Sequence, residues 1–144
     1  LILFGGGLSL ASAVSGSGLA QWLGEGLAPF GSMGVVFLII AATLLVIFLT
    51  ELTSNLATTA TFLPVIAAIA LQQDLSPLIL SVPVALAASC AFMLPVATPP
   101  NAIVFASGML TIPQMIRAGI ILNLIGMALL TLVGVWWAPM FLGG

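Results

Sequence analysis

Two apolar stretches of this chain are interrupted by short runs of polar residues and prolines. The first run is Thr50-Glu51-Leu52-Thr53-Ser54-Asn55, and the second is Leu94-Pro95-Val96-Ala97-Thr98-Pro99-Pro100-Asn101. Lipid cannot hydrogen-bond free peptide groups, so such breaks persist at membrane depth only where protein, water or a bound solute satisfies them. A pair of breaks of this kind indicates a solute and ion site.

Each break carries an asparagine at the start of the apolar piece that follows it. Asn55 would lie at the N-terminus of the second limb of a hairpin. Asn101 follows Pro99 and Pro100, which suit the first turn of a helix. The N–H groups and positive dipole at such helix ends favour an anion. We therefore expect two half-helix N-termini to face one cavity, where a carboxylate could bind without lysine or arginine.

The same runs contain oxygen ligands for a hard cation. Carbonyl, hydroxyl and amide oxygens together suit Na⁺. Unwound carbonyls near Thr50, Thr53 and Ala97 could coordinate such a cation. Further hydroxyls are found at Ser54, Thr58, Thr59 and Thr61. Hydroxyls in membrane helices commonly bond their own backbone, and we expect Ser54 to be the exception.

Glu51 is the only acidic residue near either break. At membrane depth an ionisable side chain is a functional candidate by default. Two interpretations stay open for Glu51: a structural clamp that hydrogen-bonds the hairpin tip, and a proton relay.

The composition places this chain in a membrane. Hydrophobic residues make up 62% of the 144 residues and charged residues 3%, and the mean hydropathy is +1.42. No water-soluble surface could be built from these residues, so we expect an integral, multi-pass membrane protein. With a single basic residue, Arg117, the chain has no basic patch for nucleic acid. It contains no histidine and one cysteine, so we expect neither a metalloenzyme site nor any other enzyme activity.

The hydrophobic pattern predicts an all-α membrane protein made of transmembrane helices, a re-entrant helical hairpin and one interrupted helix. Residues 1–32 are expected to form the end of a membrane helix plus an interfacial arm, and residues 33–73 the hairpin, with its tip at 50–56. Residues 74–112 would be the interrupted helix, with its break at 95–101, and residues 113–144 a C-terminal transmembrane helix. Two separate membrane crossings are the alternative to the re-entrant hairpin. Because the chain opens on Leu1 within an apolar run, we expect it to be a fragment.

The motifs resemble the C-terminal repeat of the divalent anion/sodium symporter family. The resemblance runs from Leu3-Phe4-Gly5-Gly6-Gly7 through the first break to Ala88-Ser89-Cys90-Ala91-Phe92-Met93 and the second break, ending at Ala102-Ile103-Val104-Phe105. It implies one half of an inverted-repeat transporter whose N-terminal repeat is missing here. It further implies a homodimer with an elevator-like movement.

The resemblance also implies roles for individual residues. Ser54 and Asn55 take the first two places of a Ser-Asn-Thr signature that holds substrate carboxylates and Na⁺. The residues that match the family's sodium site are Thr50, Thr53, Asn55 and Ala97, and those that match its substrate contacts include Thr98 and Pro99. Leu56 stands where the signature has threonine, so a hydroxyl donor is lost and an altered substrate preference is expected.

The function expected from these observations is Na⁺-coupled symport of a di- or tricarboxylate similar to succinate or citrate, or of sulfate. The site would comprise Ser54, Asn55, Leu56, Thr98, Pro99 and Asn101 for the anion, and Thr50, Thr53, Asn55 and Ala97 for Na⁺. The expected location is the plasma or inner membrane. The alternatives are a proton-coupled or exchanging transporter of the same fold, and a non-transporting membrane scaffold or channel subunit.

Overall fold

The structure is a computed structural model that describes residues 32–137 continuously, together with residues 9, 13, 16–18, 22, 25, 26, 29 and 140. The membrane-helix end and interfacial arm expected at 1–32 therefore lie almost wholly outside the described residues. From residue 32 to residue 137 every regular element is a helix, which agrees with the all-α prediction. The elements are α3 (Val35–Thr50), α4 (Asn55–Gln72), α5 (Pro77–Ala87), α6 (Pro99–Ala106), α7 (Ile112–Leu132) and the π-helix η1 (Val133–Trp137).

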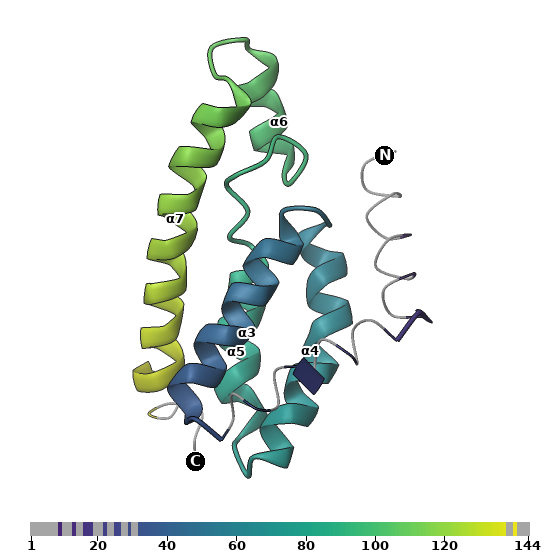
Figure 1. Ribbon diagram of the computed structural model, residues 1–144, viewed down its shortest axis with the longest axis vertical. Helices are drawn as coiled ribbons and strands as arrows, with labels where there is room; N and C mark the ends of the chain where they lie inside the picture. The colour runs from purple at the N-terminus through teal and green to yellow at the C-terminus, as the bar shows by residue number, and fades with distance from the viewer. Residues whose placement is uncertain are drawn as a thin grey trace.

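Helices α3 and α4 form a helical hairpin. They run in opposite directions and are joined by residues 51–54, which we call the tip (Figure 1). The start of α4 at Asn55 confirms the expected N-terminus of the second limb. Both limbs are apolar, so the side of the hairpin that faces the other helices has to be buried by them.

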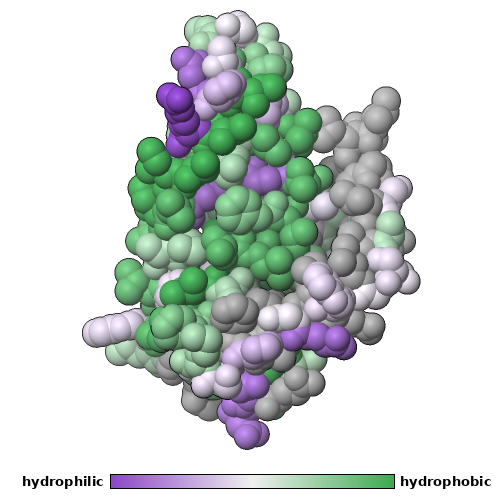
Figure 2. Space-filling view, in the orientation of Figure 1, coloured by the Kyte–Doolittle hydropathy of each residue, from purple (hydrophilic) through white to green (hydrophobic). Residues whose placement is uncertain are grey.

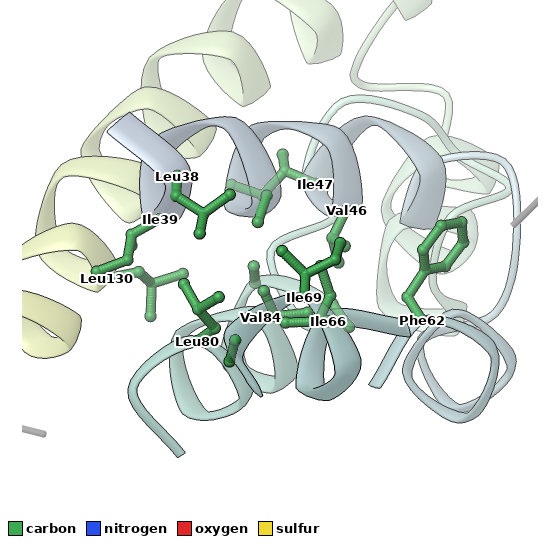
Figure 3. Packing of buried hydrophobic residues seen from close by; sticks show 14 residues of the cluster. Leu38, Ile39, Val46, Ile47, Phe62, Ile66, Ile69, Leu80, Val84 and Leu130 are labelled. Atoms are coloured by element: carbon green, nitrogen blue, oxygen red, sulfur yellow. The ribbon is translucent and has the colours of Figure 1, made fainter. Parts of the chain in front are cut away.

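Helix α3 lies at the centre of the fold, and α4, α5 and α7 each pack on it. Its buried residues recur every three or four positions from Leu38 to Thr50, which places them along one stripe of the helix. Thr43 on this stripe donates its hydroxyl hydrogen bond to Ile39 O at 2.7 Å, so the polar group is satisfied within the helix. Figure 3 shows the core that results, with side chains from α3, α4, α5 and α7: Leu38, Ile39, Val46, Ile47, Phe62, Ile66, Ile69, Leu80, Val84 and Leu130.

The second break differs from its predicted position. It was expected at 95–101, but α5 ends at Ala87 and α6 begins at Pro99, so the unwound segment covers residues 88–98. The start at Pro99 follows from the two prolines, whose missing N–H groups cost nothing in a first turn. The early end of α5 has a tertiary cause, because side chains from other elements satisfy the peptide groups of residues 91–94. We keep the name second break for residues 88–98.

Helix α6 extends beyond the hairpin tip, and α7 returns alongside the whole molecule (Figure 1). Thr111 and Gln114 form a capping box at the start of α7, and Pro113 lies in its first turn as expected. Residues 112–137 form one continuous helical run of 26 residues, and an 18-residue stretch within it has a mean hydropathy of 2.3. Within the described part of the chain it is the one helix long and apolar enough to cross a bilayer.

The outer surface is largely apolar. Figure 2 shows apolar side chains over most of the α7 side, with polar residues gathered mainly toward the two ends of the molecule. Many large side chains of α7 are exposed, including Ile121, Leu124 and Leu129. An apolar surface of this extent fits lipid or further helices around this unit.

Candidate ion and anion site at the two breaks

The hairpin tip is a short turn closed by a helix cap. Ser54 is the N-cap of α4, and its Oγ accepts a hydrogen bond from the N–H of Ala57 at 3.1 Å. The cap satisfies one of the N–H groups exposed at the start of α4. Ser54 was expected to be the hydroxyl that does not bond to its own backbone, but its side chain also has a backbone partner.

Thr50 and Asn55 meet across the tip. Thr50 Oγ1 lies 2.9 Å from Asn55 Oδ1 and 2.7 Å from the carbonyl oxygen of Ala88. A hydroxyl has one proton, so Thr50 can donate to only one of the two acceptors at a time. Three neutral oxygens are therefore gathered where the tip meets the second break, and this donor set fits a hard cation such as Na⁺.

Thr53 is directed into the hairpin itself. Its hydroxyl donates to Leu49 O at 3.0 Å and is hydrogen-bonded to the hydroxyl of Thr58. Thr59 donates to Asn55 O at 2.8 Å, which is the backbone bonding expected of such hydroxyls. Any contribution of Thr53 to a cation site would therefore come from its carbonyl oxygen.

Thr98 gives α6 the same kind of cap that Ser54 gives α4. It is the N-cap of α6, and its Oγ1 accepts a hydrogen bond from the N–H of Asn101 at 3.4 Å. Pro99 and Pro100 are exposed at the first two positions of the helix. This start of α6 confirms the prediction that the two prolines mark the beginning of the second half-helix.

Asn101 and Asn55 are not equivalent in the structure. Asn55 is the first residue of α4, whereas Asn101 is the third residue of α6. The Asn101 Nδ2 group donates to the carbonyl oxygens of Ala91 and Leu94, at 2.9 and 3.0 Å. Both of its N–H donors are therefore used on the second break, and Asn101 has none left for a carboxylate ligand.

Glu51 joins the tip to the second break. The residue is 2% exposed. Its Oε1 accepts a hydrogen bond from the N–H of Phe92 at 2.9 Å, and its Oε2 accepts one from the N–H of Leu94 at 3.0 Å. The N–H of Met93 lies between, 3.0 and 3.1 Å from the two oxygens. Three consecutive peptide N–H groups thus surround one carboxylate, the arrangement that stabilises an anion.

Asn123 is a partner of Glu51 that the sequence reasoning missed. It lies in α7, is 5% exposed, and its Nδ2 donates to Glu51 Oε1 at 2.9 Å. The Oδ1 of Asn123 is buried and has no hydrogen-bond partner among the described residues. The signal that could have identified it is an amide in the middle of an apolar spanning segment, Leu122-Asn123-Leu124.

These contacts favour the clamp interpretation of Glu51 over the proton relay. All its partners are N–H donors: three backbone groups and one amide. A carboxylate accepts from four donors, whereas a protonated carboxyl would direct an O–H against one of them. The clamp, however, holds the second break as well as the tip.

Gly119 allows α7 to approach the second break closely. A Cβ atom at this position would lie 2.5 Å from the carbonyl oxygen of Phe92 and 2.6 Å from Met93 Cα. Gly119 precedes Asn123 by one helical turn, so both residues lie on the same face of α7. The missing side chain therefore permits the backbone contact that brings Asn123 within reach of Glu51.

Leu56 and Ala97 differ in their surroundings. Leu56 is 60% exposed at the second position of α4, so its side chain extends away from the protein interior. Ala97 is 7% exposed, and its N–H donates to Leu94 O at 3.2 Å. The link from Ala97 to the tip runs through Leu94, whose own N–H donates to Glu51.

An apolar surface, a spanning helix and a buried polar contact between two helix breaks define a helical membrane protein with a candidate solute site. The chain belongs to the family described as the sodium:sulfate symporter transmembrane region, whose pattern matches residues 1–143.

Curated relatives carry the name sodium-dependent dicarboxylate transporter SdcS. The protein from Staphylococcus saprophyticus is 47% identical over 143 residues, which cover 99% of this chain and 28% of the relative. Those from Staphylococcus aureus strains USA300 and N315 are each 48% identical over 143 residues, again 99% of this chain and 28% of the relative. The chain therefore spans little more than a quarter of the length of these relatives.

Proposed function

We propose that this chain forms the ion- and anion-binding half of a Na⁺-coupled symporter for di- or tricarboxylates, or for sulfate, in the plasma or inner membrane. The contact of Thr50 with Asn55 and Ala88, which gathers neutral oxygens at the meeting point of the two breaks, is the observation that carries this proposal. The family description and the names of the relatives support Na⁺ and dicarboxylate or sulfate as the transported species.

The hairpin of α3 and α4 would be re-entrant. With 16 and 18 residues the helices are about 24 and 27 Å long, shorter than the roughly 30 Å of a bilayer's hydrocarbon core. Their connection holds a buried Glu51 and a capped turn instead of a hydrophilic loop. Both features support a tip that ends inside the protein, in one of two inverted repeats of a homodimer.

Na⁺ would bind at the junction of the two breaks. Thr50 and Asn55 would supply side-chain oxygens, and Thr53 and Ala97 would supply carbonyl oxygens from unwound backbone. The 2.9 Å contact between Thr50 and Asn55 supports the first pair. Because Thr50 also contacts Ala88 O, the binding of an ion at the tip would depend on the position of the second break.

The anion would take its hydrogen bonds mainly from α4. Pro99 and Pro100 have no N–H, and the N–H of Asn101 is directed to Thr98, so α6 offers a dipole but few donors. At α4, the Ser54 cap occupies only the third N–H group, that of Ala57. The N–H groups of Asn55 and Leu56, the Asn55 amide and the Thr98 hydroxyl would then contact the substrate.

The residues expected at the anion site would accordingly divide into two groups. Ser54, Asn55, Leu56, Thr98 and Pro99 would line the site. Asn101 would hold the second break in shape, since both of its N–H donors are used on Ala91 and Leu94. Exposed Leu56 would give the anion's carbon chain an apolar contact, which supports a carboxylate over sulfate.

The test is uptake of radiolabelled succinate, citrate and sulfate into proteoliposomes of the full-length parent protein, with an inward Na⁺ gradient or a K⁺ control. Asn55→Ala should abolish Na⁺-dependent uptake. Gln73→Ala, which removes an exposed amide at the opposite end of α4, is the matched control and should retain it. Uptake indifferent to Na⁺ would refute the coupling, and full activity in Asn55→Ala would refute the site.

A further inference from the structure

We propose that Asn123 is a positioning residue for ion and anion binding: through Glu51 it fixes the second break against the hairpin tip, and so sets how strongly Na⁺ and the anion support each other's binding. This inference rests on the proposed function and assigns it a residue outside the two breaks. Among the described residues the hydrogen bond of the Asn123 side chain goes to the Glu51 carboxylate and to none of the candidate ligands, so Asn123 would act through Glu51.

Glu51 directly follows Thr50 at the end of α3, and both side chains contact the second break. Thr50 contacts Ala88 O at the start of the second break, while Glu51 accepts from the N–H groups of residues 92–94. Two neighbouring side chains at the end of α3 thus hold two places on the second break. A shift of the Glu51 carboxylate would therefore move the second break relative to Thr50.

Leu94 connects Glu51 to the candidate ligands through hydrogen bonds. Leu94 donates its N–H to Glu51 Oε2, and its carbonyl oxygen accepts from the N–H of Ala97 at 3.2 Å. The same carbonyl accepts from Asn101 Nδ2 at 3.0 Å. Leu94 therefore joins the carboxylate to both Ala97 and α6, and Thr98 lies between these two points along the chain.

Asn123 contacts the same Glu51 carboxylate from α7. Its Nδ2 donates to Glu51 Oε1, the oxygen that also accepts from Phe92 and lies 3.0 Å from Met93 N. The Oδ1 atom has no partner among the described residues, so only the donor side of this amide is hydrogen-bonded there. Leaving a buried acceptor unpaired is unfavourable. At Asn123 this cost accompanies a hydrogen bond from the same amide to the Glu51 carboxylate.

Helix α7 packs tightly against the second break next to this contact. Gly119, one turn from Asn123, has no room for a Cβ against Phe92 and Met93. The backbone of α7 therefore cannot move closer to the second break to compensate for a lost side chain. Without the Asn123 donor, Glu51 would be held by the second break alone and would no longer be tied to α7.

The experiment compares Asn123→Leu, which has the same branched arrangement of heavy atoms and lacks the donor, with Asn123→Ser, whose shorter hydroxyl loses direct contact with Glu51. Thr131→Val is the matched control, because the Thr131 hydroxyl lies on the same helix and bonds its own Met127 O at 2.8 Å. Two quantities are measured on the full-length protein: the half-saturating Na⁺ concentration for succinate uptake, and amide hydrogen exchange of residues 92–94 in Na⁺-free buffer.

The expected result is a half-saturating Na⁺ concentration raised about tenfold in both Asn123 variants, the scale of one hydrogen bond to a charged group. Exchange at residues 92–94 should be faster in both, while Thr131→Val matches the parent. A half-saturating Na⁺ concentration within twofold of the parent would overturn the inference, even if exchange or thermal stability changed, because the role would then be structural only. If the parent itself shows no Na⁺ dependence, the proposed function fails first, and that result is visible before any variant is made.

Discussion

The Nδ2 atom of Asn123 lies 2.9 Å from Oε1 of Glu51, although the two residues are 72 positions apart in the chain. This contact connects α7 to the hairpin tip at the point where Glu51 also holds three peptide N–H groups of the second break. Three segments that are separate in sequence therefore meet on one buried carboxylate.

Replacing Glu51 with glutamine should destabilise the protein. The substituted side chain would direct an NH2 group against N–H donors of the second break, and the charge-assisted hydrogen bonds would be lost. We expect a loss of about 2–3 kcal/mol in the free energy of unfolding, since hydrogen bonds to charged groups contribute roughly 1.5–3 kcal/mol each. Thermal unfolding of the detergent-solubilised full-length protein measures it. Asp74→Asn, at an exposed turn residue with φ of 54°, is the control, and equal stability of Glu51→Gln and the parent would contradict the clamp.

Adding a methyl group at Gly119 should cost more than adding one at Gly126. At Gly119 the added Cβ meets the backbone of Phe92 and Met93 at 2.5–2.7 Å, which cannot move aside easily. At Gly126 it meets the Cys90 side chain at 3.2 Å. We expect Gly119→Ala to lose about 1–3 kcal/mol of stability, as overpacking typically does, and Gly126→Ala to lose less. The reverse order in chemical or thermal unfolding would show that α7 does not rest on the second break.

Replacing Thr50 with valine should weaken Na⁺ binding more than stability. The change keeps the side-chain shape and removes the hydroxyl that lies near both Asn55 Oδ1 and Ala88 O. We expect a rise of about tenfold in the half-saturating Na⁺ concentration for uptake, equivalent to roughly 1.4 kcal/mol. Thr43→Val on the same helix is the matched control, because the Thr43 hydroxyl bonds only to carbonyls of its own helix. An unchanged Na⁺ dependence in Thr50→Val would remove Thr50 from the site.

Replacing Leu56 with threonine should change substrate preference with little effect on stability. Leu56 is 60% exposed, and substitutions at exposed positions usually change stability by no more than about 0.5 kcal/mol. A hydroxyl at this position would add a donor beside the Ser54 cap and Asn55. We expect tighter binding of anions rich in oxygen relative to succinate, measured by competition of sulfate and citrate against labelled succinate. An unchanged order of inhibition would place Leu56 outside the anion site.

The positions where α4 and α6 begin could be predicted from the sequence because their signals are local. Ser54 caps a helix that begins at the next residue, and Thr98 stands immediately before two prolines that fit a first turn. The start of α7 is equally local, with a capping box and Pro113. The residue types around these starts also led to the prediction of an anion and a hard cation at the two breaks.

The end of α5 and the partners of Glu51 could not be predicted in this way. Helix α5 ends at Ala87 because the N–H groups of residues 92–94 bond to a carboxylate more than 40 positions earlier, and the Asn101 amide holds two carbonyls of the same segment. The residues next to these positions in the sequence do not predict such contacts.

The sequence by itself determined that this is a helical membrane protein with two polar breaks, because hydropathy, caps and prolines act within a few residues. Only the tertiary structure decided which breaks and helices meet. It placed Asn123 on Glu51, gave the two donors of Asn101 to the second break, and brought Thr50 between Asn55 and Ala88. The contacts of Asn123 with Glu51 and of Thr50 with Ala88 depend on the packing of α7 and the second break against the end of α3, because helix packing brings together residues that are far apart in the chain.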